Sequence, residues 1–280
     1  MTIKTRQIIC IFLYLTFFIA TPLIIAYAAG YKFNFNKNRT MPFSLQKTGM
    51  FILDSQPPNA KIFINNQIQQ NLINKIFFNK TNNITTPAKI KNLLPGEYTI
   101  KLELPGYWPW EKKLRITSGN STYAENIFLF KQSAPVLIKA TEINNLANKN
   151  TIESSDSEVL SRFKKNNNIK YAELINDSKL IYANDFEIWL NDLADKKQTL
   201  ITRISDNITG IAWHPSNNYI IYSTDKTINV IEMDEREKRS NTELIKFDKI
   251  SSLFINPKGT TLYFQAKVDD QEGLYKLNIQ

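Results

Sequence analysis

The chain has 280 residues, of which 42% are hydrophobic and 22% charged, enough for one large or two moderate globular domains. One cysteine, Cys10, and one histidine, His214, exclude an internal disulfide framework and a thiolate or multi-histidine metal site. The net charge of +9 is uneven, because residues 1–140 hold 17 Lys and Arg against 5 Asp and Glu, whereas residues 141–280 hold 18 against 21.

An uncharged apolar run covers residues 8–29, directly after Lys4 and Arg6. As a helix it would span roughly 33 Å, the thickness of a bilayer core. We therefore predict a transmembrane anchor at residues 1–30. The alternative is a signal peptide cleaved near Ala28, since Ala26-Tyr27-Ala28 fits a small-residue cleavage pattern, although a signal peptide core is usually only about 7–15 residues long.

Residues 31–48 contain four basic residues and no acidic one, so we expect a basic juxtamembrane tether. It is either solvated or in contact with anionic lipid headgroups. Its charge opposes the positive-inside signal of the N-terminus. A very short N-terminus before a long folded region still favours a single-pass protein with a cytoplasmic N-terminus and residues 31–280 extracytoplasmic.

Residues 49–131 alternate apolar and polar side chains in short runs, which is the period of half-buried strands. The clearest run, 98–104, follows a Leu-Pro-Gly turn, and a second alternating run covers 112–116. Further strands are expected at 49–54, 60–64 and 122–130, the last with Tyr123, Ile127 and Leu129 on its inner face.

The order of these motifs resembles a PEGA domain, a small β-sandwich module of bacterial and archaeal surface proteins. The name-giving motif has Pro where the family has Glu and Asn where it has Gly, and Asn tolerates the left-handed conformation better than other non-glycine residues. The matching motif residues are Pro57, Pro58, Asn59, Ala60, Thr86, Pro87, Leu94, Pro95, Gly96, Gly106 and Tyr107.

The segment 66–85 is longer than a short hairpin link of this family. Its apolar residues Ile73, Ile76, Phe77 and Phe78 predict an extra β-arm packed on the module. An exposed apolar loop that contacts a partner is the alternative.

Trp108 and Trp110 follow Tyr107 in a dense aromatic group. Core packing is the favoured interpretation, because large aromatic residues dominate small cores. A stacking platform for a sugar ring is the alternative, and these two tryptophans are the candidate ligand contacts of the module.

Residues 132–280 repeat with a period of about forty, seen in Leu180-Ile181-Tyr182, Ile220-Ile221-Tyr222 and Thr261-Leu262-Tyr263. A turn precedes each triplet and an apolar alternating run follows it. The segment Ile-Ala-Trp-His-Pro-Ser at 211–216 resembles blade openings of WD-repeat and TolB-like propellers. Three units are fewer than the usual 4–8 blades, so we predict a partial or small propeller-like domain whose open end is covered by residues 135–140 or by a partner chain.

No catalytic, cofactor-binding or metal-binding residue is predicted. His214 occupies a turn position that holds Asn256 in the next unit, so we interpret it as structural. The acidic residues of 269–273 do not have the spacing of a 12-residue calcium loop and are interpreted as a solvated hairpin tip.

The expected fold is mainly β, with an N-terminal transmembrane helix (1–30), a basic tether (31–48), a small PEGA-like sandwich (49–131) and propeller-like blades (132–280). We expect a non-enzymatic, membrane-anchored binding or cell-envelope scaffold protein without cofactors. Its expected partners are membrane lipid through the helix, and envelope polysaccharide or surface proteins. Nucleic acid is not expected, because no basic face interleaved with aromatics is evident. The alternatives are an accessory or gating subunit of an envelope hydrolase and an extracytoplasmic sensor.

Overall fold

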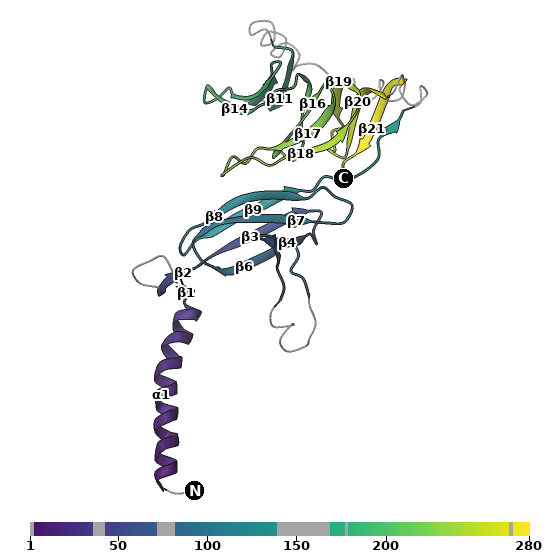
Figure 1. Cartoon of the computed structure of the whole chain (residues 1–280). Coiled ribbons are helices and arrows are strands. Elements are labelled where there is room, and N and C mark those ends of the chain that lie inside the picture. The colour runs from purple at the N-terminus through teal and green to yellow at the C-terminus, as the bar shows by residue number, and fades with distance from the viewer. Residues whose placement is uncertain (1–2, 36–42, 72–81, 139–168, 177–178, 269–270) are drawn as a thin grey trace. The chain divides into compact units, whose positions relative to one another are not determined.

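A computed structural model describes residues 3–35, 43–71, 82–138, 169–176, 179–268 and 271–280, which contain one helix and a series of antiparallel sheets (Figure 1). The predicted mainly-β fold with one N-terminal helix is confirmed. The chain divides into two compact units. Unit 1 comprises Met1–Leu102 and Lys113–Ile127, and unit 2 comprises Glu103–Lys112 and Phe128–Gln280.

Helix α1 (Ile3–Ala28) contains the apolar run. Its segment Thr5–Ala28 has a mean hydropathy of 2.6 and is not buried by the rest of the protein. Among the described residues it is the one helix whose length and composition fit a membrane crossing, a test that an N-terminal signal sequence also passes.

Within the predicted tether, β1 (Tyr31–Phe35) and β2 (Phe43–Lys47) pair as an antiparallel hairpin. The sequence analysis did not predict this hairpin. The tether was inferred from charge, although Tyr31 and Phe33 alternate with polar residues at the two-residue period of a strand.

Two sheets form the β-sandwich that follows, one with the strand order β6–β3–β9 and the other with β5–β4–β7–β8 (Figure 1). Alternate side chains of these strands are buried, as in β8, where every second residue is inward. The strands are β3 (Gly49–Gln56), β4 (Lys61–Ile64), β5 (Gln67–Ile68), β6 (Ala88–Leu93), β7 (Gly96–Glu103), β8 (Trp110–Ile116) and β9 (Ser121–Phe128).

The predicted inner faces are correct in β7, where Ile100 and Leu102 are fully buried. In β9 the prediction for Tyr123 was wrong, because its side chain is 51% exposed. Asn126 has a φ of 59°, which interrupts the regular alternation. Ala124 is therefore inward instead.

The predicted β-arm begins as an extension of the sheet. Beyond β5, the Ile84 N–H donates to the Gln69 carbonyl at 2.8 Å and the Asn71 N–H donates to the Asn82 carbonyl at 3.0 Å, so the two sides run antiparallel. The apolar residues 73, 76, 77 and 78 lie outside the described residues. Whether the arm is packed or exposed therefore stays a prediction.

The described residues of unit 2 form three four-stranded antiparallel sheets (Figure 1). The first two are up-and-down meanders like propeller blades, and in the third the fourth strand comes from an earlier part of the chain. The first comprises β11 (Tyr171–Asn176), β12 (Lys179–Ala183), β13 (Glu187–Asp192) and β14 (Lys197–Arg203). The second comprises β15 (Ile208–Trp213), β16 (Tyr219–Thr224), β17 (Thr227–Glu232) and β18 (Asn241–Lys246). The third comprises β19 (Lys249–Ile255), β20 (Thr261–Val268), β21 (Gln271–Asn278) and β10 (Val136–Leu137).

The predicted repeat is visible in the turns that follow the first strands of the second and third sheets. The Asn217 N–H donates to the His214 carbonyl, and the Gly259 N–H donates to the Asn256 carbonyl, both at 2.9 Å. Asn217 and Gly259 both have a positive φ. The same turn therefore recurs at equivalent positions, which supports the prediction of propeller-like blades.

Strand β10 completes the third sheet from the opposite end of the domain sequence. Val136 pairs with Lys276, and the Ile138 N–H donates to the Leu274 carbonyl at 2.8 Å. The last sheet is thus extended by residues 136–138, which lie within the segment 135–140 that the sequence offered as one of two alternatives. In Figure 1 β10 is the teal strand beside β21.

Candidate functional site

Two of the PEGA-type motifs, at 57–60 and 86–87, meet in unit 1 through a chain of hydrogen bonds. The Ala60 N–H donates to Thr86 Oγ1 at 3.0 Å, Thr86 Oγ1 lies 2.6 Å from Ser55 Oγ, and the Ser55 hydroxyl donates to the Pro57 carbonyl at 2.8 Å. Asn59 has a φ of 72°, as predicted for the position where the family has Gly. These contacts shape the turn and leave no reactive group.

Trp108 and Trp110 lie in unit 2. Trp110 is buried, and Trp108 packs against the cluster that contains Phe128, Phe130 and Tyr219. The cavity beside them has a volume of about 10 Å³, which is room for a single water. Both tryptophans are packed, but the cluster that Trp108 contacts belongs to unit 2 and not to the sandwich core that the sequence indicated. Ligand contact at these tryptophans stays a prediction.

A buried ion-pair cluster in unit 2 includes Lys112, two residues after Trp110. Lys112 Nζ is 3.0 Å from Glu232 Oε2 and 3.1 Å from Asp234 Oδ2, and it donates to the Asp234 carbonyl at 2.6 Å. Burial raises the pKa of Glu232, an effect that Lys112 opposes. Burial alone would also raise the pKa of Asp234, but hydrogen bonds from Arg236 and Lys112 hold it at about 2. The Trp110 indole makes no hydrogen bond of normal geometry, although it lies close enough to Glu232 to lower its pKa slightly.

His214 is buried in its turn, and both ring nitrogens are engaged. Nε2 donates to the Gly259 carbonyl at 3.2 Å, and Nδ1 accepts from Ser216, whose Oγ is 2.8 Å away. Burial lowers the pKa of His214 to about 4, so the ring is neutral at pH 7. This arrangement fits the structural role that the sequence indicates for His214.

A cavity of about 590 Å³, the inner-strand pocket, is lined by the first strands of all three sheets, β11, β15 and β19. Glu173, Ile211 and Leu253 line it from equivalent positions, three residues before the first turn residue of each unit. Trp213 and Phe254 add aromatic surface. The pocket is therefore mainly apolar, and Glu173 is the one charged residue among those that line it, with Asn256 as a further polar residue.

The Glu173 carboxylate is held from one side. Oε2 accepts the backbone N–H of Trp213 at 2.6 Å. Burial raises the pKa of Glu173 to about 7, and the Trp213 hydrogen bond only partly opposes this effect. Near neutral pH the group can accept a hydrogen bond as a carboxylate or donate one as a carboxylic acid, which suits binding of a polar group inside an apolar pocket.

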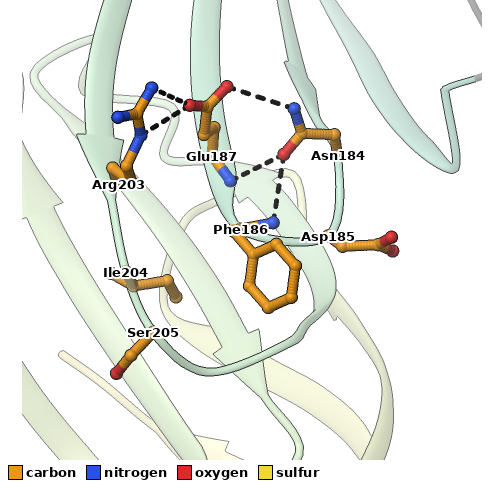
Figure 2. A pocket seen from close by; sticks show the side chains of 7 residues that line it. All are labelled: Asn184, Asp185, Phe186, Glu187, Arg203, Ile204 and Ser205. Carbon is orange, nitrogen blue, oxygen red and sulfur yellow. Dashed lines mark hydrogen bonds and ion pairs between the residues drawn. The ribbon is translucent and has the colours of Figure 1, made fainter.

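A second, more open pocket of about 640 Å³ lies at the β12–β13 turn and is called the hairpin pocket (Figure 2). Phe186 is 49% exposed there. Glu187 accepts hydrogen bonds from Arg203 Nε at 2.6 Å and from Asn184 Nδ2 at 3.2 Å (Figure 2). A hydrogen bond from Trp189 and those from Arg203 and Asn184 lower the pKa of Glu187. Since the charges of Glu187 and Arg203 satisfy one another, this pocket offers mainly an aromatic contact.

Sequence reasoning missed Glu173 and the buried state of Lys112. Aligning the repeat units on their turns would have shown Glu173 where the other units carry Ile211 and Leu253. The acidic residues 269 and 270 of the suggested hairpin tip lie outside the described residues. Among the described residues, no group of three His, Cys, Asp or Glu side chains is placed to hold a metal ion.

The model of the PEGA domain family matches residues 74–131, which confirms the resemblance for that part of the chain. The motif at 57–60 precedes the matched segment and joins it through the Thr86 hydrogen bonds described above. No curated protein matches the sequence significantly.

Several solved structures resemble parts of the chain. Hydrazine synthase of Kuenenia stuttgartiensis is 16% identical over 39% of this chain and 32% of its own, with a TM-score of 0.34. TolB from Acinetobacter baumannii is 13% identical over 66% and 41%, with a TM-score of 0.31. The WD40 repeats of RRP9 are 10% identical over 83% and 79%, with a TM-score of 0.32. The chain thus spans less than two thirds of the length of the hydrazine synthase chain and of TolB. Similarities with such low TM-scores do not support any functional assignment. The description of the sheets as propeller-like blades rests on their strand order.

Proposed function

We propose that the chain is a non-enzymatic, membrane-anchored protein that displays a PEGA-type sandwich and a three-sheet propeller-like domain for binding on the extracytoplasmic side. The observation that carries the binding role is the inner-strand pocket, where three equivalent strands surround one carboxylate with apolar and aromatic side chains. The groups that line it include no nucleophile paired with a base, which supports binding rather than catalysis.

Anchoring is supported by α1. Its apolar side chains are exposed to a degree that water does not favour, for example Phe18 at 71% and Ile11 at 66%. A bilayer would cover them. The orientation proposed is a cytoplasmic N-terminus, with both units on the opposite side of the membrane.

The orientation is tested with single-cysteine variants in intact cells. In a Cys10→Ser background, Lys258→Cys places a thiol at an exposed position of unit 2. A membrane-impermeant maleimide should label it without cell lysis. Labelling that appears only after lysis would place unit 2 in the cytoplasm and overturn the proposed location.

The binding role is tested by retention of the detergent-solubilised full chain on immobilised envelope polysaccharide and on immobilised surface proteins. Glu173→Gln keeps the shape of the side chain but removes its charge, and it should lower retention at least several-fold on the matrix that binds. Glu243→Gln, an exposed position on β18, is the matched control. Equal retention of both variants, or no retention of the wild type on either matrix, would refute the pocket as the binding surface.

A further inference from the structure

The β1–β2 hairpin carries apolar side chains on one face that are partly exposed. Phe33 pairs with Leu45, and Tyr31 lies two residues before Phe33, so the three side chains share a face. Tyr31 is 37% exposed, Phe33 42% and Leu45 48%. A two-stranded hairpin is marginally stable in water alone, and clustered exposed apolar residues mark an interaction surface.

The opposite face of the hairpin is polar. Lys32 pairs with Gln46 and Asn34 pairs with Ser44. Asn34 Nδ2 donates to Gln46 Oε1 at 3.1 Å across the strands. The hairpin is therefore two-faced, with an order of polar and apolar residues that suits a boundary between water and an apolar phase.

Both ends of the hairpin are fixed to the end of α1. The Gly30 N–H donates to the Tyr27 carbonyl at 3.0 Å, and the Gly30 carbonyl accepts both the N–H and the hydroxyl of Thr48, each at 2.7 Å. Only Ala29 and Gly30 separate α1 from Tyr31. If α1 crosses a bilayer, the base of the hairpin is held within roughly 10 Å of the end of the span.

We propose that the β1–β2 hairpin lies in the headgroup layer of an anionic lipid surface, with Tyr31, Phe33 and Leu45 directed into the lipid. The inference deepens the proposed anchoring and rests on it. Aromatic side chains favour the membrane interface. Lys47, which pairs with Tyr31 at the base of the apolar face, and Lys32 on the polar face are both exposed, and they complement anionic headgroups.

The test uses the full chain in vesicles of phosphatidylcholine and phosphatidylglycerol that contain lipids brominated near the headgroup end of the acyl chain. Cys10, labelled with a fluorophore in the wild-type chain, reports insertion of α1. In a Cys10→Ser background, Phe33→Cys and Leu45→Cys place the label on the apolar face. Lys32→Cys and Ser44→Cys are matched controls at neighbouring positions on the polar face.

Labels at Phe33→Cys and Leu45→Cys should be quenched at least about twofold more than the two controls, because an interfacial element buries its apolar face about 5–10 Å into the headgroup boundary. Equal quenching on both faces, or none on either, with Cys10 quenched, would overturn the hairpin proposal alone. A Cys10 label that the brominated lipids do not reach would overturn the anchoring as well. Unchanged circular dichroism of each variant confirms that the fold is retained.

Discussion

Two neighbouring lysines on β8 have opposite environments. The Lys112 side chain is 0% exposed and pairs with Glu232 and Asp234, whereas the Lys113 side chain is 63% exposed and lies 3.5 Å from Glu97. A buried charge is expensive when its partner is removed, while an exposed pair contributes little.

We therefore expect Lys112→Met to destabilise unit 2 by about 3–5 kcal/mol, because Glu232 remains buried without its counter-charge. Lys113→Met, the matched control, should change the free energy of unfolding by less than about 0.5 kcal/mol. Urea denaturation measures both. The Lys112 penalty should be smaller at pH 4 than at pH 7, since burial raises the pKa of Glu232 and a protonated carboxyl needs no partner. Similar values for the two variants would contradict the buried pair.

Glu173 gives unit 2 a dependence on pH. The folded pKa is about 7, above the ordinary value of 4.5, so the folded chain binds this proton more tightly than the unfolded chain. The stability that Glu173 contributes is present below about pH 4.5 and is lost as the pH rises through 7. Glu173→Gln should therefore stabilise unit 2 by about 1–3 kcal/mol at pH 8 relative to pH 5. Denaturation at the two pH values measures this difference, and Glu243→Gln should show none of it.

His214 acts in the opposite direction. Its folded pKa of about 4 lies below the ordinary value of 6.5, so its contribution is present above pH 6.5 and lost as the pH falls through 4. Between about pH 4.5 and 6.5 the two effects oppose one another. In Glu173→Gln the stability of unit 2 should consequently rise with pH across this window more steeply than in the wild type.

Single residues were the least predictable feature of the sequence. The left-handed conformation predicted for Asn59 was correct, because it follows from the chemistry of that residue. The inward position predicted for Tyr123 was wrong, because the positive φ of Asn126 interrupts the strand and reverses the alternation of its side chains. Lys112 and Glu173 were missed because their burial depends on residues 120 and 40 positions away, respectively, which no local pattern encodes.

The elements of the chain were predicted better than its residues, because each has a period of its own. The forty-residue repeat located the strands of the second and third sheets. The β1–β2 hairpin was missed because four basic residues in its segment outweighed a short aromatic alternation. The covering of the third sheet remained open between two alternatives, since β10 contributes only Val136 and Leu137 to the ladder.

Strand β10 pairs beside β21, and its Leu137 side chain packs closely against Gly273. A Cβ at position 273 would be 2.3 Å from Leu137 Cδ1, so Gly273→Ala forces Leu137 to move. Because Leu137 is 47% exposed and its side chain can turn aside, we expect a loss of only about 0.5–1 kcal/mol in unit 2. Leu137→Ala removes the obstacle, and the Gly273→Ala penalty should then fall by at least about 0.5 kcal/mol.

A double-mutant cycle by chemical denaturation measures this coupling. Hydrogen exchange at the Ile138 amide, which bonds to Leu274, gives a second reading of whether β10 is docked. Additive penalties in the cycle, with unchanged exchange at Ile138, would show that β10 does not pack against β21 in solution.

For the whole molecule, the decisive feature is the apolar surface of α1. Leu15 and Ile19 are 59% and 58% exposed and lie in the middle of the apolar run. Replacing both with Arg should cost about 5–7 kcal/mol of membrane insertion, since each Arg at a helix centre costs about 2.5–3.5 kcal/mol. The double Arg variant should leave the carbonate-resistant membrane fraction, whereas the double Ala variant should remain there. A double Arg variant that stays in that fraction would contradict anchoring by α1.

The pairing of β10 with β21 has a consequence for the order in which the chain is made. Val136 of β10 is synthesised 140 residues before its partner Lys276 of β21. The third sheet therefore cannot be completed until β21 has been synthesised. Contacts between such distant segments close slowly. Unit 2 should thus acquire its final fold only after β21 has been synthesised.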